Sequence, residues 1–139
     1  METGRSLHEI FGAAFARVRD AVRAGTPLTE TALQRWILER FDAQGLTSTD
    51  PPTVAVNQHS GDPHFDTQHA TDIPIREGDF FLIDAWCKAK RPGSIYADYT
   101  QVAFVGSSAS AGEATHGASR QATRKARGRR VSWFIWLTR

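Results

Sequence analysis

Two aspartates embedded in strongly apolar stretches most constrain what this 139-residue chain can fold into. Asp84 lies in FFLIDAW and Asp98 in IYADYTQVAF, and both stretches have the aromatic and β-branched content of strands. A buried carboxylate is costly unless it is paired, hydrogen-bonded or bound to a metal. We therefore expect both side chains to be at least partly buried. If the two strands pair antiparallel and in register, both aspartates can face one cavity and share a divalent cation.

The remaining patterns predict an α+β fold. Apolar residues at helical spacing indicate a first helix over 6–24, with Ser6 and Glu9 forming a capping box. A second helix is expected from about 29 to 44, with Thr29 as its N-cap. Strand patterns follow over three ranges, 53–57, 80–86 and 95–105. The expected architecture is two helices packed on a small, mostly antiparallel sheet.

The charge of the chain changes abruptly after Gly106. Residues 1–106 carry 10 Lys and Arg against 14 Asp and Glu, whereas residues 107–139 carry 7 against the single acid Glu113. The second segment is rich in small, polar and basic residues and has no regular apolar spacing before its last residues, which predicts a disordered tail outside the folded domain. Its basic run lacks interleaved aromatic residues, so nucleic acid is an unlikely partner.

Localisation is predicted from what the sequence does not contain. No apolar run approaches the roughly 18 residues that span a bilayer, and the N-terminal residues have no apolar core of a secretory signal. The single cysteine, Cys87, permits no internal disulfide and suits a reducing compartment. We expect a cytoplasmic protein without a membrane partner, in which Cys87 contributes to packing and is not a nucleophile.

Three histidines lie in the polar loop between the first two strand patterns. The imidazole of His64, in the triplet PHF, could donate a hydrogen bond to a substrate carbonyl if the loop folds back over the aspartates. On the residues alone, an exposed loop histidine is the stronger interpretation. His59 and His69 have no better case. For the aspartates, the alternative is that Asp84 caps a strand and Asp98 lies on a solvated edge.

A family resemblance changes this balance. The run VAVNQHSGDPHF, then I-x-x-GDFFLID, then YADYT-x-VAFVG, resembles the pita-bread metallopeptidases, a family of Xaa-Pro aminopeptidases, prolidases, methionine aminopeptidases and creatinase. The preceding AGTPLTETALQ is similar to the family's short G-x-T-E-x-E-L-like motif. The resemblance covers roughly residues 5–106 and is closest to the aminopeptidase P-like branch. It implies the first half of a pita-bread fold.

The resemblance also implies roles for individual residues. Asp84 and Asp98 match two metal-ligating aspartates, of which Asp98 bridges a pair of divalent ions (Mn, Co or Zn). His64 matches the histidine on the substrate side of the metals, and Thr100 matches the residue that supports the bridging aspartate. The implied activity is hydrolysis of an N-terminal peptide bond, with an Xaa-Pro peptide as one candidate substrate and a homodimer as one candidate assembly.

The chain departs from the family pattern in its second half. The family's metal pair has five protein ligands, and the remaining His and two Glu come from H-x-x-GH and EPG segments that this sequence lacks. We therefore expect a truncated or frame-shifted domain that is inactive alone, with an open sheet edge. The alternative function is a non-catalytic peptide- or protein-binding module on the same scaffold.

Overall fold

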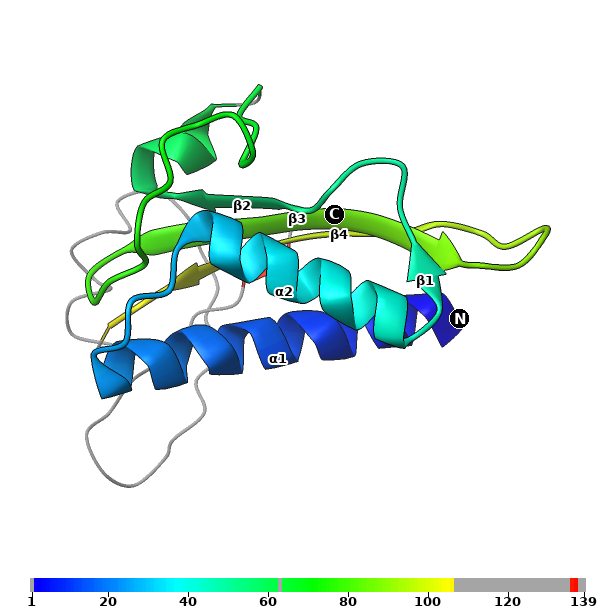
Figure 1. Cartoon of the computed structure of the whole chain (residues 1–139), viewed down its shortest axis with the longest axis horizontal. Helices are drawn as coiled ribbons and strands as arrows, with labels where there is room; N and C mark the ends of the chain where they lie inside the picture. The colour runs from blue at the N-terminus through cyan, green and yellow to red at the C-terminus, as the bar shows by residue number, and fades with distance from the viewer. Residues whose placement is uncertain (1, 63, 107–135, 138–139) are drawn as a thin grey trace.

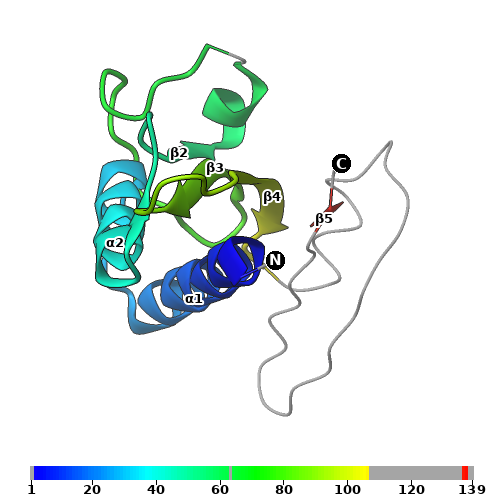
Figure 2. The same cartoon turned by 90° about the vertical axis from the view of Figure 1, so that its right-hand side faces the viewer.

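The computed structural model describes residues 2–62, 64–106 and 136–137. Within them, two α-helices lie side by side on one face of an antiparallel sheet (Figure 1). The predicted α+β fold class is therefore confirmed. Figure 2 shows both α-helices on one side of β3 and β4, with no α-helix on the other side, where the short 3-10 helix over Asn57–Gly61 lies next to β2.

The first helix, α1 (Glu2–Ala24), starts earlier than predicted. Ser6 lies inside the helix, so the expected capping box at Ser6 and Glu9 is wrong. The helix extends back to Glu2 because an acid in the first turn complements the helix dipole. Arg5 and Glu9 also form an exposed ion pair four residues apart. Its buried face matches the predicted apolar spacing and consists of Leu7, Ile10, Phe11, Ala14, Phe15 and Val18.

The second helix, α2 (Glu30–Ala43), agrees closely with its prediction. Thr29 is the N-cap, and its hydroxyl oxygen accepts a hydrogen bond of 3.2 Å from the amide of Ala32. The chain leaves the helix through Gly45, whose φ of 66° lies in the left-handed region that glycine adopts without strain.

The sheet is built around the longest strand, β3 (Phe80–Ala89). On one side it pairs antiparallel with β4 (Ala97–Phe104), which in turn pairs with β5 (Trp136–Leu137). On the other side it pairs with β1 (Leu46–Thr47) and β2 (Thr53–Val56). A 3-10 helix, η1 (Asn57–Gly61), follows β2 directly.

Strand limits differ from the predictions at the β3–β4 hairpin. The strand β3 continues to Ala89, and β4 begins only at Ala97, so the exposed turn lies over 90–96. Ile95, predicted as the start of a strand, is instead 83% exposed in this turn. The sequence analysis also missed β1, because a strand of two residues has no alternation that a pattern can detect.

Buried and half-buried side chains alternate along β3 and show which face of the sheet packs against the core. Phe81, Ile83, Ala85 and Cys87 are buried toward the helices, whereas the side chains between them are half-buried on the other face. On the core side, α1 packs on β3 and β4, and α2 packs on β1 and β2. Phe15 of α1 stacks at an angle on Phe81 with ring centroids 5.3 Å apart. We call the other face, which no α-helix of the described residues covers, the helix-free face.

Buried side chains close the outer edge of β2. Gln34 donates to the carbonyl of Pro52 (2.7 Å), Thr67 bonds both backbone groups of Val54, and Glu30 accepts from the amide of Val56 (2.7 Å). These three side chains are almost without solvent contact. The edge of β2 is therefore closed, because side chains satisfy the backbone groups that a further strand would pair. The open edge expected from the missing second half stays a prediction.

The tail prediction falls largely outside the described residues. Trp136–Leu137 is the described part of it, and its backbone pairs with Gln101 and Val102 of β4. The boundary at Gly106 stays a prediction. None of the helices in the described ranges is long and apolar enough to cross a membrane.

Candidate functional site

Asp84 occupies the middle of the helix-free face. It lies on β3 directly opposite Thr100 of β4 on one side and Thr53 of β2 on the other. Thr100 Oγ1 donates a hydrogen bond of 2.5 Å to Asp84 Oδ1. The carboxylate is half-buried, as predicted, and the bond holds one of its two oxygens in place.

Asp98 lies on the same face of the sheet, two residues before Thr100 on β4. Its backbone partner is Trp86, so Asp98 is the diagonal neighbour of Asp84. Such diagonal positions are separated by about 7 Å, a span that two carboxylates can bridge through a cation. Asp98 is exposed, however, and not half-buried like Asp84. The prediction of similar burial is wrong because β4 lies nearer the rim of the described sheet.

His64 lies in the loop after η1 and is exposed. Its backbone amide donates to Asp62 Oδ1 (2.9 Å), and the amide of Phe65 donates to the carbonyl of Asp62 (3.1 Å). This tight turn fixes the backbone at His64. Among the described residues, no hydrogen bond or ion pair joins the His64 side chain to Asp84 or Asp98.

Of the metal ligands predicted from the sequence, the described part of the chain contains Asp84 and Asp98. No group of three His, Cys, Asp or Glu side chains lies together there. Carboxylate oxygens suit hard divalent ions, so Asp84 and Asp98 fit one side of a metal centre. They do not form a complete ligand set.

The sequence analysis missed a second polar cluster at the edge of β2. Glu30 is fully buried, and His59 Nδ1 lies 2.9 Å from Glu30 Oε1 and 3.1 Å from Glu30 Oε2. The His59 ring also stacks on Phe65, with centroids 4.3 Å apart. The available signal was the acid at the start of a helix followed by a histidine just after a strand.

Cys87 is buried on the helix side of β3, as its predicted packing role requires. Burial raises the pKa of its thiol to about 11. The thiol is therefore protonated near neutral pH and is a poor nucleophile. This result confirms that Cys87 belongs to the core and not to a catalytic site.

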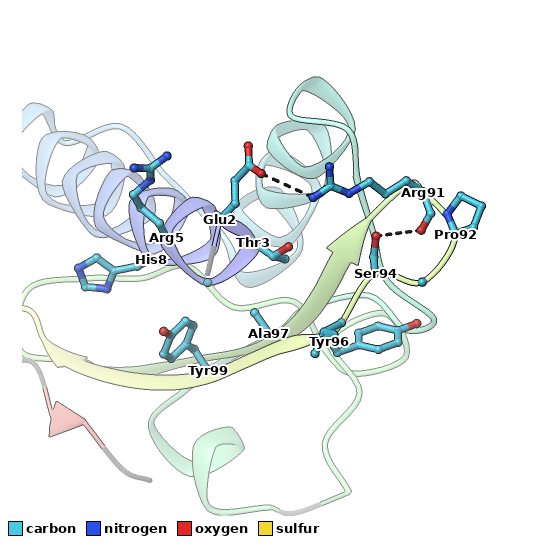
Figure 3. A pocket seen from close by; sticks show the side chains of 13 residues that line it. Glu2, Thr3, Arg5, His8, Arg91, Pro92, Ser94, Tyr96, Ala97 and Tyr99 are labelled. Carbon is cyan, nitrogen blue, oxygen red and sulfur yellow. Dashed lines mark hydrogen bonds and ion pairs between the residues drawn. The ribbon is translucent and has the colours of Figure 1, made fainter.

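The hollow in Figure 3 lies away from the aspartates. Its volume is about 870 Å³, and it lies between the start of α1 and the β3–β4 turn. Ala97 and Tyr99 line it, and these residues alternate with Asp98 along β4, so they point to the opposite face of the sheet. Arg91 and Glu2 pair across the hollow at 3.6 Å and are both largely exposed.

A family model described as metallopeptidase family M24 matches residues 2–132, which is almost the whole chain. A search of curated proteins finds no match.

Proposed function

Because this chain belongs to metallopeptidase family M24, we propose that it is an aminopeptidase-like hydrolase domain of the aminopeptidase P-like branch. Its substrate would be a peptide with a free N-terminus, with an Xaa-Pro peptide as the first candidate. The observation that carries the proposal is the placement of Asp84, Thr100 and Asp98 on the one sheet face that no helix covers. Localisation in the cytoplasm belongs to the same proposal.

The family is metal-dependent, and the two aspartates would hold the ions. Asp84 would bind through its outer oxygen, because Thr100 already donates to Oδ1. Asp98 would reach the same ions from the diagonal position. A pair of Mn, Co or Zn ions supplies a nucleophilic water and polarises the carbonyl when bound. The half-buried position of Asp84 strengthens its attraction to a cation relative to an exposed carboxylate.

The other residues would orient the substrate. The exposed imidazole of His64 can donate a hydrogen bond to the carbonyl oxygen of the scissile bond. Half-buried apolar side chains on the helix-free face, among them Leu82 and Trp86, can contact the substrate's side chains and exclude water. The indole nitrogen of Trp86 donates to Thr49 Oγ1 (3.1 Å), which fixes the ring.

We further propose that this chain alone is inactive. Two carboxylates hold a dinuclear centre poorly against water, and the sequence lacks the H-x-x-GH and EPG segments that carry the other ligands in the family. A second polypeptide that carries such segments would be needed to complete the centre.

Metal binding and turnover can be tested together on the full chain. We expect calorimetric titration to show weak Mn²⁺ binding that Asp84→Asn and Asp98→Asn each abolish. Asp20→Asn is the matched control, because Asp20 is an exposed acid on α1, behind the sheet. An Xaa-Pro peptide with added Mn²⁺ should not be hydrolysed. Robust hydrolysis that Asp84→Ala abolishes would contradict the proposed inactivity, and Mn²⁺ binding unchanged in both aspartate variants would contradict the metal site.

One observation favours a second function, a non-catalytic peptide-binding module. The helix-free face carries four half-buried apolar side chains around the aspartates, namely Phe80, Leu82, Trp86 and Val102. Such a surface can bind an apolar peptide without any metal. Peptide binding that is equal in the wild type and in Asp84→Asn, with or without Mn²⁺, would favour this function over the first.

A further inference from the structure

The fully buried carboxylate of Glu30 connects helix α2 to the loop that carries His64. Glu30 is the first residue of α2, and its side chain is 1% exposed. Its Oε1 accepts a hydrogen bond of 2.7 Å from the amide of Val56, the last residue of β2. Both carboxylate oxygens contact His59 Nδ1, at 2.9 and 3.1 Å. The side chain of His59 is 18% exposed, so the pair is shielded from solvent screening.

His59 in turn contacts the loop that carries His64. Its ring stacks on Phe65 with an interplanar angle of 23°. Phe65 follows His64 directly, and the amides of both residues bond to Asp62. A short chain of contacts therefore runs from Glu30 through His59 to Phe65, the residue next to His64.

A charged residue at this position is not needed to close the edge of β2. Gln34 and Thr67 satisfy the neighbouring backbone groups of the same edge with neutral side chains. Burying a carboxylate carries a larger desolvation penalty than burying an amide or a hydroxyl. Of the three edge residues, Glu30 is the one whose described contacts include an imidazole. The pairing with His59 thus needs an explanation beyond edge closure.

We propose that Glu30 and His59 are positioning residues for His64. The carboxylate holds the Nδ1 side of the His59 ring, the ring fixes Phe65, and Phe65 sets the direction in which the adjacent His64 imidazole projects. The proposal rests on the proposed role of His64 on the substrate side. It assigns a role to two residues that do not themselves touch the substrate.

The test follows the imidazole signals of His59 and His64 by nuclear magnetic resonance in the full chain. Added Mn²⁺ broadens signals of nuclei near the ion, so it reports whether His64 faces Asp84 and Asp98. Glu30→Gln keeps an acceptor for the Val56 amide and removes the charge. Phe65→Leu breaks the stacking and leaves the Glu30–His59 pair. Gln34→Met is the matched control, because Gln34 is also buried, lies on α2 and bonds the same strand edge.

We expect Mn²⁺ to broaden His64 in the wild type and in Gln34→Met, and much less in Glu30→Gln and Phe65→Leu. The signals of Asp84 and Asp98 should broaden in all four proteins. His64 broadening that is unchanged in Glu30→Gln would overturn the positioning role. A loss in Gln34→Met as large as in Glu30→Gln would also overturn it, because general loosening of the edge would then suffice.

The two proposals fail in different ways. If Mn²⁺ broadens neither Asp84 nor Asp98 in the wild type, the proposed metal function fails. The positioning role is then decided by metal-free spectra, in which the His64 ring signals must shift in Glu30→Gln and stay in place in Gln34→Met. A shift in neither variant overturns it.

Discussion

Thr100 lies directly opposite Asp84 in the β3–β4 ladder, and its hydroxyl donates a 2.5 Å hydrogen bond to Asp84 Oδ1. This bond satisfies one oxygen of a half-buried carboxylate and leaves the other oxygen available. The resemblance assigned Thr100 to the support of the bridging aspartate, Asp98. In the structure Thr100 instead bonds Asp84, its partner across the strands.

Removing this hydroxyl should weaken both the fold and the metal site. Thr100→Val leaves a half-buried acceptor without its donor, and we expect the free energy of unfolding to fall by about 1–2 kcal/mol. Loss of a ligand's supporting hydrogen bond should also weaken Mn²⁺ binding by about tenfold or more. Urea denaturation and calorimetry measure the two effects. Thr100→Ser, which keeps the hydroxyl, should remain close to the wild type, and an equal loss in both variants would contradict the role of the hydrogen bond.

The backbone at Asn57 gives a prediction about the β2–η1 junction. Asn57 has a φ of 50°. Its side-chain nitrogen Nδ2 donates to Asp79 Oδ1 (2.9 Å), and its side-chain oxygen Oδ1 accepts from the backbone amide of Phe80 (3.0 Å). Asn57→Ala should destabilise the chain by about 2 kcal/mol, since it loses both hydrogen bonds and places a Cβ in the left-handed region without them. Asn57→Gly relieves the backbone and should lose less. Thermal unfolding of the two variants separates these effects, and equal losses would show that the backbone conformation is unimportant.

Much of the fold could be predicted because its signals are local. The apolar spacing of α1 and the alternation along β3 each lie within one segment. The placement of Asp98 diagonal to Asp84 also needs the β3–β4 register, which the sequence analysis stated only as a condition. The exposure of Asp98 could not be predicted, because it depends on which strand covers β4. Glu30 was harder still, since its burial depends on contacts with Val56 and His59, far along the chain.

Cys87 predicts a loss of stability at high pH. Its folded-state pKa is raised by burial from the ordinary value of 9.0 to about 11. Its contribution to stability is therefore complete below the unfolded pKa and is lost as the pH rises toward the folded pKa. The free energy of unfolding should fall by about 2 kcal/mol between pH 9.0 and about 11.

The matched control for this titration is Cys87→Ala, which removes the thiol. The free energy of unfolding of Cys87→Ala should be lower at all pH values because of the cavity. It should not show the fall at high pH that ionisation of the thiol causes. A decline of the same size in both proteins would assign it to other groups. Thiol labelling at neutral pH should also be slow in the folded chain and fast in urea, because the side chain is buried.

Substitutions of Thr67 test whether a neutral side chain closes the edge of β2. Its hydroxyl accepts from the Val54 amide (2.9 Å) and donates to the Val54 carbonyl (3.2 Å). Thr67→Val keeps the shape and leaves two buried backbone groups unpaired, so we expect a loss of about 1–3 kcal/mol. Thr67→Ser should retain most of the stability. Hydrogen exchange at the Val54 amide is the local measurement, and unchanged protection in Thr67→Val would show that the hydroxyl does not close this edge.

A chain that ends at Gly106 tests the predicted domain boundary. All residues of the described hydrophobic core lie between Leu7 and Val105, and Gly106 itself is buried. We expect the shortened chain to keep a cooperative thermal transition, with a modest decrease in midpoint from the lost pairing with Gln101 and Val102. A chain that loses its transition altogether would place the boundary beyond Gly106.

The buried side chains along β2 block the addition of a further strand at that edge of the sheet. Gln34, Thr67 and Glu30 occupy the hydrogen-bonding positions that another strand would use on that side. A strand that adds on the β2 side would have to displace these side chains. On the other side, the described pairing of β4 with β5 involves Gln101 and Val102, so a strand that pairs with the start of β4 would lie beside Asp98 and not beside Glu30.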